Sequence, residues 1–251
     1  MTEATPAEAK PAEAILTLDG VHTHIGPYHV LHGMSFSVPR GQLTMLLGRN
    51  GAGKTTTLRS IMGLWHASSG RIVFDGRDIT AVATPDIARA GIAYVPETMG
   101  IFGGLSVREN LVLAARSAPI DPARLDWILT LFPALKRFWA LPAGHLSGGQ
   151  KQMLAIARAI AEPRRMLLVD EPTKGLAPVM IRSMIEAFKA LKAAGETVLL
   201  VEQNFHAASM LGDRAVVVDD GRVVHAGPMS DLAADTGLQQ RLLGLSMDAH
   251  Q

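Results

Sequence analysis

The chain of 251 residues suits one or two domains with a large core, and its 48% hydrophobic and 19% charged residues exclude a disordered chain. The 24 Lys and Arg residues nearly balance the 23 Asp and Glu residues, so the net charge of +1 gives no reason to expect binding along a nucleic-acid backbone. The absence of cysteine excludes disulfides, thiolate metal sites and a catalytic thiol.

Residues 1–14 are dominated by Ala, Glu, Pro and Thr, and they lack the apolar segment of a signal peptide. We expect a disordered tail there, and a second short tail at residues 246–251. Between the tails, no apolar run approaches the roughly 20 residues that cross a membrane. If the protein serves a membrane, we expect it to dock on another chain that crosses it.

In the first half of the chain, some segments alternate apolar and polar residues as strands do, and others space their apolar residues as helices do. The apolar run Leu43–Leu47 ends at Gly48, which predicts a buried parallel strand. Asp75 and Gly76 predict the turn of a hairpin. The elements predicted in this half are strands at 15–25, 30–38 and 43–47, a helix at 54–64, a hairpin at 70–79, and a short helix and strand at 87–96.

The middle of the chain changes to helical spacing of apolar residues, at 106–115, 124–131 and 147–161. Asp121 and Pro122 predict an N-cap and the first helical position after it. Strands and helices then alternate again, at 166–170, 178–194, 197–202, 205–211 and 214–218. Strand–helix alternation on both sides of a helical insert predicts a parallel α/β core with a helical subdomain.

A candidate phosphate loop lies between the strand at 43–47 and the helix at 54–64. Residues 48–55 match the pattern G-x-x-x-x-G-K-[ST]. Glycines let backbone N–H groups curl around phosphate oxygens, and the helix N-terminus attracts their charge. Lys54 is predicted to reach the β- and γ-phosphates and Thr55 to hold Mg²⁺, whereas a glycine turn before an ordinary helix is the alternative. The predicted nucleotide-binding residues are Gly48, Asn50, Gly51, Ala52, Gly53, Lys54, Thr55 and Thr56.

Two carboxylates follow the apolar strand at 166–170. A buried strand would carry Asp170 to the sheet edge where α/β folds bind ligands. Asp170 is predicted to complete the Mg²⁺ coordination, and Glu171 to polarise or deprotonate the attacking water. A solvated pair of acidic residues in a loop is the alternative, which the phosphate loop upstream disfavours.

The helix at 147–161 opens with the segment Leu146–Gln150. Ser147 and Gln150 have the spacing of a capping box, which satisfies backbone donors. Capping does not explain the adjacent Gly148 and Gly149, which are expected where a phosphate approaches a helix N-terminus. The chain thus has two candidate phosphate-binding helix starts, which serve either one nucleotide or two different ones.

The loop at 48–55, the signature at 146–150 and the carboxylates at 170–171, in this order, resemble the ATP-binding subunits of ABC transporters over residues 15–245. The finer pattern is similar to the LivF-type subunit of branched-chain amino-acid importers, with the subunits of urea and amide importers as the alternative. The segments that carry this finer resemblance are 50–56, 69–74, 152–156, 175–178 and 201–204.

The resemblance implies a P-loop NTPase (RecA-like) core with an antiparallel β subdomain and a helical subdomain at about 98–157. It implies ATP and Mg²⁺ as cofactors and hydrolysis of ATP to ADP and phosphate. It also implies a head-to-tail dimer, in which the signature of one subunit meets the γ-phosphate held by the other. The implied signature contacts are Ser147, Gly148, Gly149 and Gln150.

The implied partners are two membrane permease subunits, a paralogous ATPase or a second copy of this chain and, indirectly, an external solute-binding protein. The chain would lie peripherally on the cytoplasmic face of the cell membrane, with residues 99–105 towards the permeases. A soluble ABC ATPase acting on ribosomes or DNA would usually carry two units or a long coiled-coil insert, and neither is visible here. A nucleotide sensor with negligible turnover is the third alternative.

Three positions depart from the general ABC pattern and agree with the LivF-type pattern. Glu97 stands where a Gln usually senses Mg²⁺ and the attacking water, Gln203 where a His usually touches the γ-phosphate, and Ala177 where an Asp is usual. The resemblance therefore assigns Glu97 and Gln203 to the catalytic site, and Glu97 also to the metal. Because an amide does not titrate near neutral pH, Glu171 is the predicted general base.

The aromatic residue that usually stacks on adenine has no direct equivalent. Alignment with the usual His-Tyr-Gly places Ile25 at that position, and Tyr28, three residues further on, is the alternative. Loss of a base–aromatic stack costs about 1–3 kcal/mol, although Ile25 still offers apolar contact.

Two further groups of residues have structural as well as functional interpretations. The histidines at 22, 24, 29 and 32 crowd the start of the chain, and without cysteine or an obvious carboxylate partner we expect ordinary surface or hairpin positions rather than a metal site. The apolar residues at 131–139 predict core packing in the helical insert, with a surface for a membrane partner as the alternative.

Overall fold

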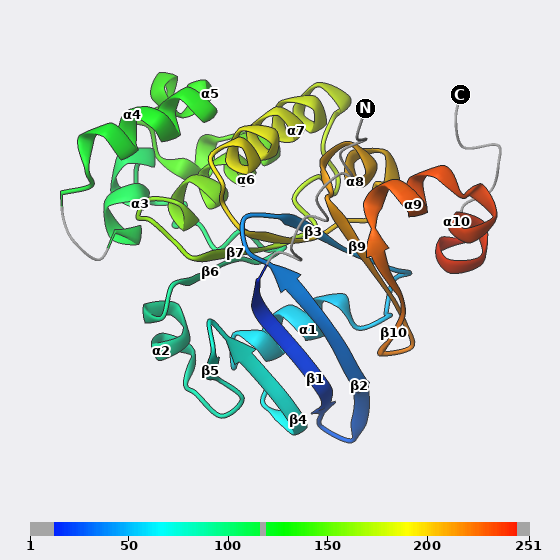
Figure 1. The fold of residues 1–251 in the computed structure, drawn as a ribbon. Coiled ribbons are helices and arrows are strands. Elements are labelled where there is room, and N and C mark those ends of the chain that lie inside the picture. Colours follow the sequence, from blue (N-terminus) through cyan, green and yellow to red (C-terminus); the bar gives the residue numbers. More distant parts are fainter. Residues whose placement is uncertain (1–12, 116–118, 245–251) are drawn as a thin grey trace, which may run out of the picture.

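Two β-sheets form the framework of residues 13–115 and 119–244, which the computed structural model describes (Figure 1). The tails predicted at 1–14 and 246–251 lie outside these ranges, except for Glu13 and for Ala14, which already belongs to the first strand. Within the described ranges, no helix combines the length and the apolar character that a bilayer crossing requires.

The larger sheet has the strand order β10-β9-β3-β8-β7-β6, in which β10 runs antiparallel to β9 and the other neighbours are parallel. Strands β3, β7 and β8 are buried at every residue, as expected for a parallel sheet covered on both faces. Because these three strands are neighbours, the loops that follow them leave the same edge of the sheet side by side. The strands of this sheet are β3 (Leu43–Leu47), β6 (Ile92–Val95), β7 (Met166–Asp170), β8 (Val198–Val201), β9 (Arg214–Asp219) and β10 (Arg222–Pro228).

The smaller sheet is antiparallel, with the order β2-β1-β4-β5. Asp75 and Gly76 connect β4 to β5 with φ angles of +49° and +76°, and positive φ at both central residues is what a type I′ hairpin turn requires. The predicted hairpin is therefore confirmed. The strands of this sheet are β1 (Ala14–Ile25), β2 (Tyr28–Pro39), β4 (Ala67–Phe74) and β5 (Arg77–Asp78).

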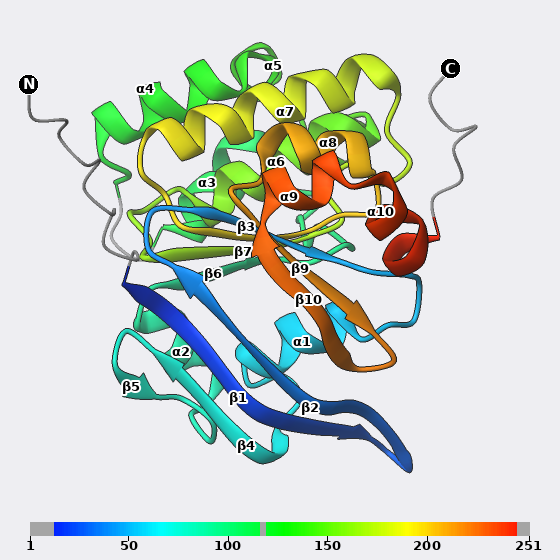
Figure 2. The same ribbon diagram turned by 45° about the vertical axis from the view of Figure 1, so that its right-hand side comes forward.

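Helices cover the larger sheet on both faces, with α6, α7 and α8 on one side and α1 on the other, between the two sheets (Figures 1 and 2). Asp121 caps α4 as predicted, because its carboxylate accepts a hydrogen bond of 2.8 Å from the Arg124 backbone N–H. The helices are α1 (Lys54–Ile61), α2 (Thr84–Arg89), α3 (Val107–Ala114), α4 (Pro122–Leu131), α5 (Pro133–Arg137), α6 (Gly148–Ala159), α7 (Pro178–Ala193), α8 (Phe205–Leu211), α9 (Met229–Ala234) and α10 (Thr236–Leu243).

Successive side chains of the central strands enter two hydrophobic cores. Met45 and Leu47 of β3 pack with the helices above the sheet, whereas Leu46 packs with α1 and the smaller sheet below it. Phe132 and Leu135 are fully buried in the upper core, which confirms core packing for this part of the helical insert. The two cores clamp the strands from both faces, so the loops at their carboxyl ends start from rigid positions.

The loop that precedes α3 is shaped by one buried amide. The side chain of Asn110 is fully buried, and its Oδ1 accepts a hydrogen bond of 2.9 Å from the Phe102 backbone N–H. Its Nδ2 donates to the backbone oxygens of Phe102, Leu105 and Ser106 at 2.9, 3.3 and 3.0 Å. Residues 99–105 are the segment that we expect to face a membrane partner, and these hydrogen bonds fix part of it to α3.

We predict that Asn110→Ala lowers the free energy of unfolding by about 1–3 kcal/mol, because backbone groups of residues 102–106 lose their buried partner. Chemical denaturation measures this loss, and hydrogen exchange should accelerate at residues 102–106 but not in β3, β7 or β8. Leu113→Ala is the control, since Leu113 is 60% exposed on the same helix and should change stability by less than about 0.5 kcal/mol. Unchanged exchange at residues 102–106 would contradict this role of Asn110.

Candidate nucleotide-binding site

The phosphate loop begins at a position that only glycine can occupy. Gly48 follows β3 with φ of +145°, and a Cβ there would collide with the Val218 carbonyl oxygen of β9. The chain therefore turns against the neighbouring strand and enters α1 at Lys54. The strand–loop–helix context predicted for residues 48–55 is confirmed.

No side chain among the described residues caps the N-terminus of α1. Helices α2, α5, α7 and α9 also lack such a cap, whereas α3, α4, α6, α8 and α10 are capped by Ser106, Asp121, Ser147, Asn204 and Asp235. A cavity of about 290 Å³ lies at the uncapped end. Helix N–H groups without an internal partner, together with the helix dipole, favour an anion there. The cavity is lined by Val30, Asn50, Gly51, Gly53, Lys54, Thr55, Thr56 and Glu171.

Lys54 places its ammonium group inside the loop itself. Its Nζ donates hydrogen bonds of 2.8 and 3.0 Å to the backbone oxygens of Gly48 and Arg49. Burial lowers the pKa of Lys54, while the nearby carboxylates of Glu171 and Asp170 oppose that shift. A buried cation that is held by neutral carbonyls is well placed to exchange them for phosphate oxygens.

Asp170 ends β7 beside Thr55 of α1. The Thr55 hydroxyl donates to Asp170 Oδ1 at 3.2 Å, and the Tyr94 hydroxyl approaches Oδ2 at 3.5 Å. Burial raises the pKa of Asp170, and the hydrogen bond from Thr55 works against that rise. A hydroxyl and a carboxylate are hard oxygen ligands of the kind that Mg²⁺ prefers, so this pair fits the predicted metal site.

Glu171 has a strained backbone and a carboxylate that is held on both sides. Its φ is +49°, an uncommon conformation for a residue with a side chain, which costs of order 1–3 kcal/mol. Gln203 Nε2 donates to Glu171 Oε1 at 2.6 Å, and Lys174 Nζ lies 3.2 Å from Oε2. The structure thus brings together Glu171 and Gln203, which are 32 residues apart in the sequence. Lys174 Nζ also donates a hydrogen bond of 2.7 Å to Glu97 Oε1, so Glu97 is linked to Glu171 through Lys174.

Glu202 is a residue of this site that the sequence analysis missed. Its buried carboxylate accepts hydrogen bonds from Thr173 N and Oγ1 at 3.1 and 2.9 Å, and from the N–H groups of Gln203 and Asn204 at 3.2 and 3.3 Å. Burial raises the pKa of Glu202, and these hydrogen bonds oppose the rise. The one signal in the sequence is a carboxylate directly after the apolar run of β8.

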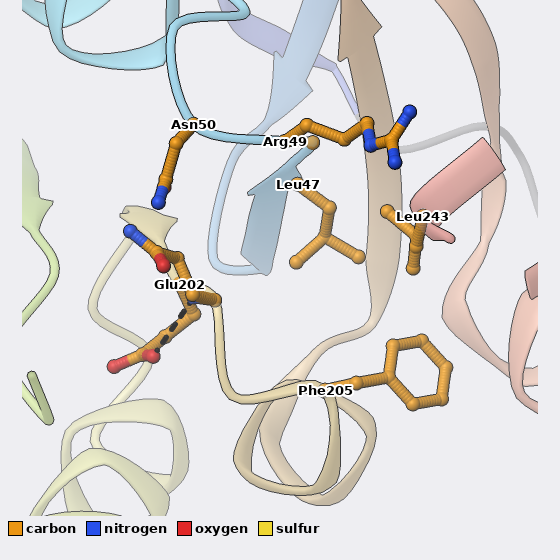
Figure 3. Close-up of a pocket in the computed structure, with 8 residues that line it drawn as sticks. Leu47, Arg49, Asn50, Glu202, Phe205 and Leu243 are labelled. Atoms are coloured by element: carbon orange, nitrogen blue, oxygen red, sulfur yellow. Dashed lines mark hydrogen bonds between the residues drawn. The ribbon is translucent and has the colours of Figure 1, made fainter. Parts of the chain in front are cut away.

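A second cavity, of about 240 Å³, lies on the other side of the phosphate loop. Figure 3 shows Asn50 and Glu202 on its polar side, and Leu47, Phe205 and Leu243 on its apolar side. Asn50 borders this cavity as well as the one at the α1 N-terminus. The loop therefore separates two hollows, and Glu171 lines the one at α1.

The signature segment forms the capping box that its spacing predicts. Gln150 N donates to Ser147 Oγ at 3.4 Å, and Ser147 N donates to Gln150 Oε1 at 2.9 Å. A Cβ at Gly149 would lie 2.5 Å from the end of the Met180 side chain, so packing against α7 explains this glycine. At Gly148, a Cβ would meet no described atom within 4 Å. Among the described residues, those lining the two cavities at the phosphate loop do not include residues 147–150.

The residues predicted for adenine lie at the tip of the β1–β2 hairpin. Ile25 and Tyr28 pair with each other across the turn, and Tyr28 is 73% exposed. Neither is among the described residues that line the phosphate-loop cavities. Val30 does line the cavity at α1, at a position where the pairing of β1 with β2 is irregular. The contact of Ile25 or Tyr28 with adenine stays a prediction.

The four histidines gather on the same hairpin. The ring of His29 stacks on His24 with centroids 4.1 Å apart, and its Nε2 lies 3.0 Å from Nδ1 of His22. In residues 13–115 and 119–244, no group of three or more His, Asp or Glu side chains has the arrangement of a metal site.

Comparison with known proteins agrees with this geometry. The family model described as ABC transporter matches residues 31–174, more than half of the 251 residues. The high-affinity branched-chain amino acid transport ATP-binding protein BraG of Pseudomonas aeruginosa is 39% identical, over 92% of this chain and 100% of that protein. The probable branched-chain amino acid transport ATP-binding protein LivF of Archaeoglobus fulgidus is 34% identical, over 86% of this chain and 93% of that protein.

Solved structures give the same result. The ADP conformation of MJ1267, an ATP-binding cassette of an ABC transporter, is similar with a TM-score of 0.78 and 26% identity, over 91% of this chain and 98% of that one. An ATP-binding subunit of an ABC transporter is similar with a TM-score of 0.77 and 32% identity, over 93% and 96%. The P-loop NTPase fold with its antiparallel β subdomain is thereby confirmed. The chain belongs to the ABC transporter family, as an ATP-binding cassette that hydrolyses ATP.

Proposed function

We propose that the chain is the ATP-hydrolysing subunit of an importer for branched-chain or other hydrophobic amino acids. The similarity to BraG and LivF over nearly the whole chain carries this proposal. The importer would contain two permease subunits and a second ATPase subunit, paralogous or identical, and would receive its solute from an external binding protein. The chain would lie on the cytoplasmic side of the membrane.

In this proposal the phosphate groups of ATP occupy the cavity at the α1 N-terminus. The Lys54 ammonium exchanges its two carbonyl partners for phosphate oxygens. Thr55 and Asp170 would hold Mg²⁺, with Glu97 as the third predicted ligand. When bound, the metal supplies positive charge against the charge of the transferring phosphoryl group.

Glu171 would accept the proton of the attacking water. Its carboxylate lines the phosphate cavity and is aimed by the strained turn after β7, which supports the role. Gln203 donates to one carboxylate oxygen and would keep it oriented while the other accepts the proton. The amide itself neither gives nor takes a proton in this step.

The second nucleotide contact would come from another subunit. Gly148 leaves open space at the start of α6, which is what close approach of a phosphate to a helix N-terminus requires. In a head-to-tail dimer, Ser147, Gly148, Gly149 and Gln150 would meet the γ-phosphate bound by the partner subunit. Each subunit would then supply half of two sites.

The permeases would dock on residues 99–105 and the outer face of α3. Phe102, Val112 and Leu113 are large apolar side chains exposed in this region, and the Arg158 guanidinium stacks over the Phe102 ring at 5.0 Å. Their exposure supports a protein partner on this part of the chain.

We predict that Glu171→Gln binds ATP with an affinity within about twofold of wild type and loses hydrolysis by roughly 10²–10⁴, the usual contribution of a general base. Steady-state phosphate release and binding of a fluorescent ATP analogue measure the two effects. Glu186→Gln, on the exposed face of α7, is the control and should behave as wild type. Near-wild-type turnover of Glu171→Gln would place the base elsewhere.

We predict that Gly148→Ala and Gly149→Ala fail in different ways. Gly148→Ala should keep the melting temperature, because its Cβ has open space, but should reduce ATP-dependent dimerisation and turnover by at least about tenfold. Gly149→Ala should lower the melting temperature, because its Cβ meets Met180. Thermal denaturation and size-exclusion chromatography with ATP separate the two outcomes. Full activity of Gly148→Ala would contradict the approach of a phosphate at this residue.

The solute class is tested by deleting the coding sequence in the source organism. Uptake of labelled leucine should fall and should return with the wild-type chain but not with Glu171→Gln. Urea uptake is the comparison that separates the alternative importer class. Loss of urea uptake alone, with leucine uptake intact, would overturn the amino-acid proposal.

A further inference from the structure

Lys174 joins two carboxylates of the site that come from different loops. Its Nζ donates to Glu97 Oε1 at 2.7 Å and lies 3.2 Å from Glu171 Oε2. Lys174 lies in the turn after β7 and precedes α7, and the sequence analysis gave it no role. A single ammonium group therefore connects the loops that follow two neighbouring strands.

The sheet register explains why the two carboxylates meet. Strands β6 and β7 are parallel neighbours, with Val95 paired to Val169. Glu97 and Glu171 each lie two residues beyond those paired positions, so they leave the sheet edge at the same level. Asp170, the last residue of β7, adds a third carboxylate.

The three carboxylates carry negative charge next to the loop that would bind the negatively charged phosphates, so the two would repel each other. Lys54 is turned towards the carbonyls of Gly48 and Arg49, within the loop. Lys174 is the cation that makes an ion pair with both Glu97 and Glu171 among the described residues. The ammonium group of a lysine is charged at neutral pH, so these two ion pairs place one positive charge between the two carboxylates.

We propose that Lys174 is a positioning residue of the ATP site, which holds Glu97 and Glu171 on one ammonium group and offsets their charge where the phosphates bind. Gln203 donates a hydrogen bond to Oε1 of Glu171, and the Lys174 ammonium lies near Oε2 in an ion pair, so the carboxylate is oriented from both sides while Oε2 keeps a lone pair for the proton. This inference rests on the proposed role of Glu171 as the base. Side-chain exposure of 54% at Lys174 and 46% at Glu97 means that the pair adds little to folding stability, so its effect is sought in turnover and binding.

The first test is Lys174→Met, which keeps an unbranched side chain and removes the charge. Turnover should fall roughly tenfold with the KM for Mg·ATP within about twofold, because the base loses its orientation while the phosphate loop is intact. Lys174→Arg should restore at least about half of the turnover, because a guanidinium can also pair with two carboxylates. Lys189→Met is the matched control, since Lys189 pairs with Glu186 on the outer face of α7. All variants should share the wild-type melting temperature.

The second test combines Lys174→Met with Glu97→Gln. If Lys174 acts on the carboxylate of Glu97, its removal should cost less in the Glu97→Gln background than in the wild type. Equal losses in both backgrounds would exclude coupling between the two side chains.

The third test needs no turnover. In EDTA, a fluorescent ATP analogue should bind Lys174→Met about threefold or more weakly than wild type, because uncompensated carboxylates repel the triphosphate. The loss should disappear in the double variant with Glu97→Gln. If Lys174→Met behaves as Lys189→Met in all three tests while Glu171→Gln is inactive, the inference is overturned and the proposed function stands. If Glu171→Gln is active, the proposed base itself is wrong.

Discussion

The site depends on one buried carboxylate that ties two loops together at the sheet edge. Glu202 follows β8, and its carboxylate accepts four hydrogen bonds, two from Thr173 in the turn after β7 and two from the backbone of Gln203 and Asn204. An ionised group without partners is costly to bury, so these donors are a condition for its burial. The same contacts fix the turn that carries Glu171 and the residue that carries the Gln203 amide. Glu202 therefore sets the relative position of Glu171 and the Gln203 amide, although it contacts neither the nucleotide nor the attacking water in the proposed reaction.

Near Glu202, two backbone features that are unfavourable by themselves occur at the proposed ATP site. The phosphate helix α1 begins without a side-chain cap, as α2, α5, α7 and α9 also do, and Glu171 adopts a left-handed backbone that a side chain disfavours. Both departures lower stability when considered alone. They occur on a rigid edge, because β3, β7 and β8 are clamped by cores on both faces. Local strain of this kind is tolerated where the surrounding structure fixes it, and functional sites are where it is usually found.

The parts of the fold that the sequence predicts are those with strong local chemistry. The buried parallel strands, the phosphate loop, the Asp75-Gly76 turn and the Asp121 cap each follow from residues within a few positions of one another. The three elements after β9 are missed: β10 contains Gly227 and Pro228, α9 has only six residues, and α10 contains Gly237. The contacts of Glu202 with Thr173 and of Lys174 with Glu97 span 29 and 77 residues, so sheet order alone brings them together. The position of Val30 at the phosphate cavity could not be predicted either. Its residue type does not indicate a ligand contact, and its place depends on the irregular pairing of β1 with β2.

The two glycines of the signature show how a motif can combine structural and functional causes. A Cβ at Gly149 would crowd the Met180 side chain of α7, so packing within the chain favours this glycine, whereas the space above Gly148 is left open by every described residue. The capping box of Ser147 and Gln150 then stabilises the helix start without filling that space. Neither phosphate-loop cavity is lined by this segment among the described residues. A helix start that is capped and left open at Gly148 fits the proposed head-to-tail dimer, in which another subunit would deliver the phosphate and hydrolysis would depend on the closing of that interface.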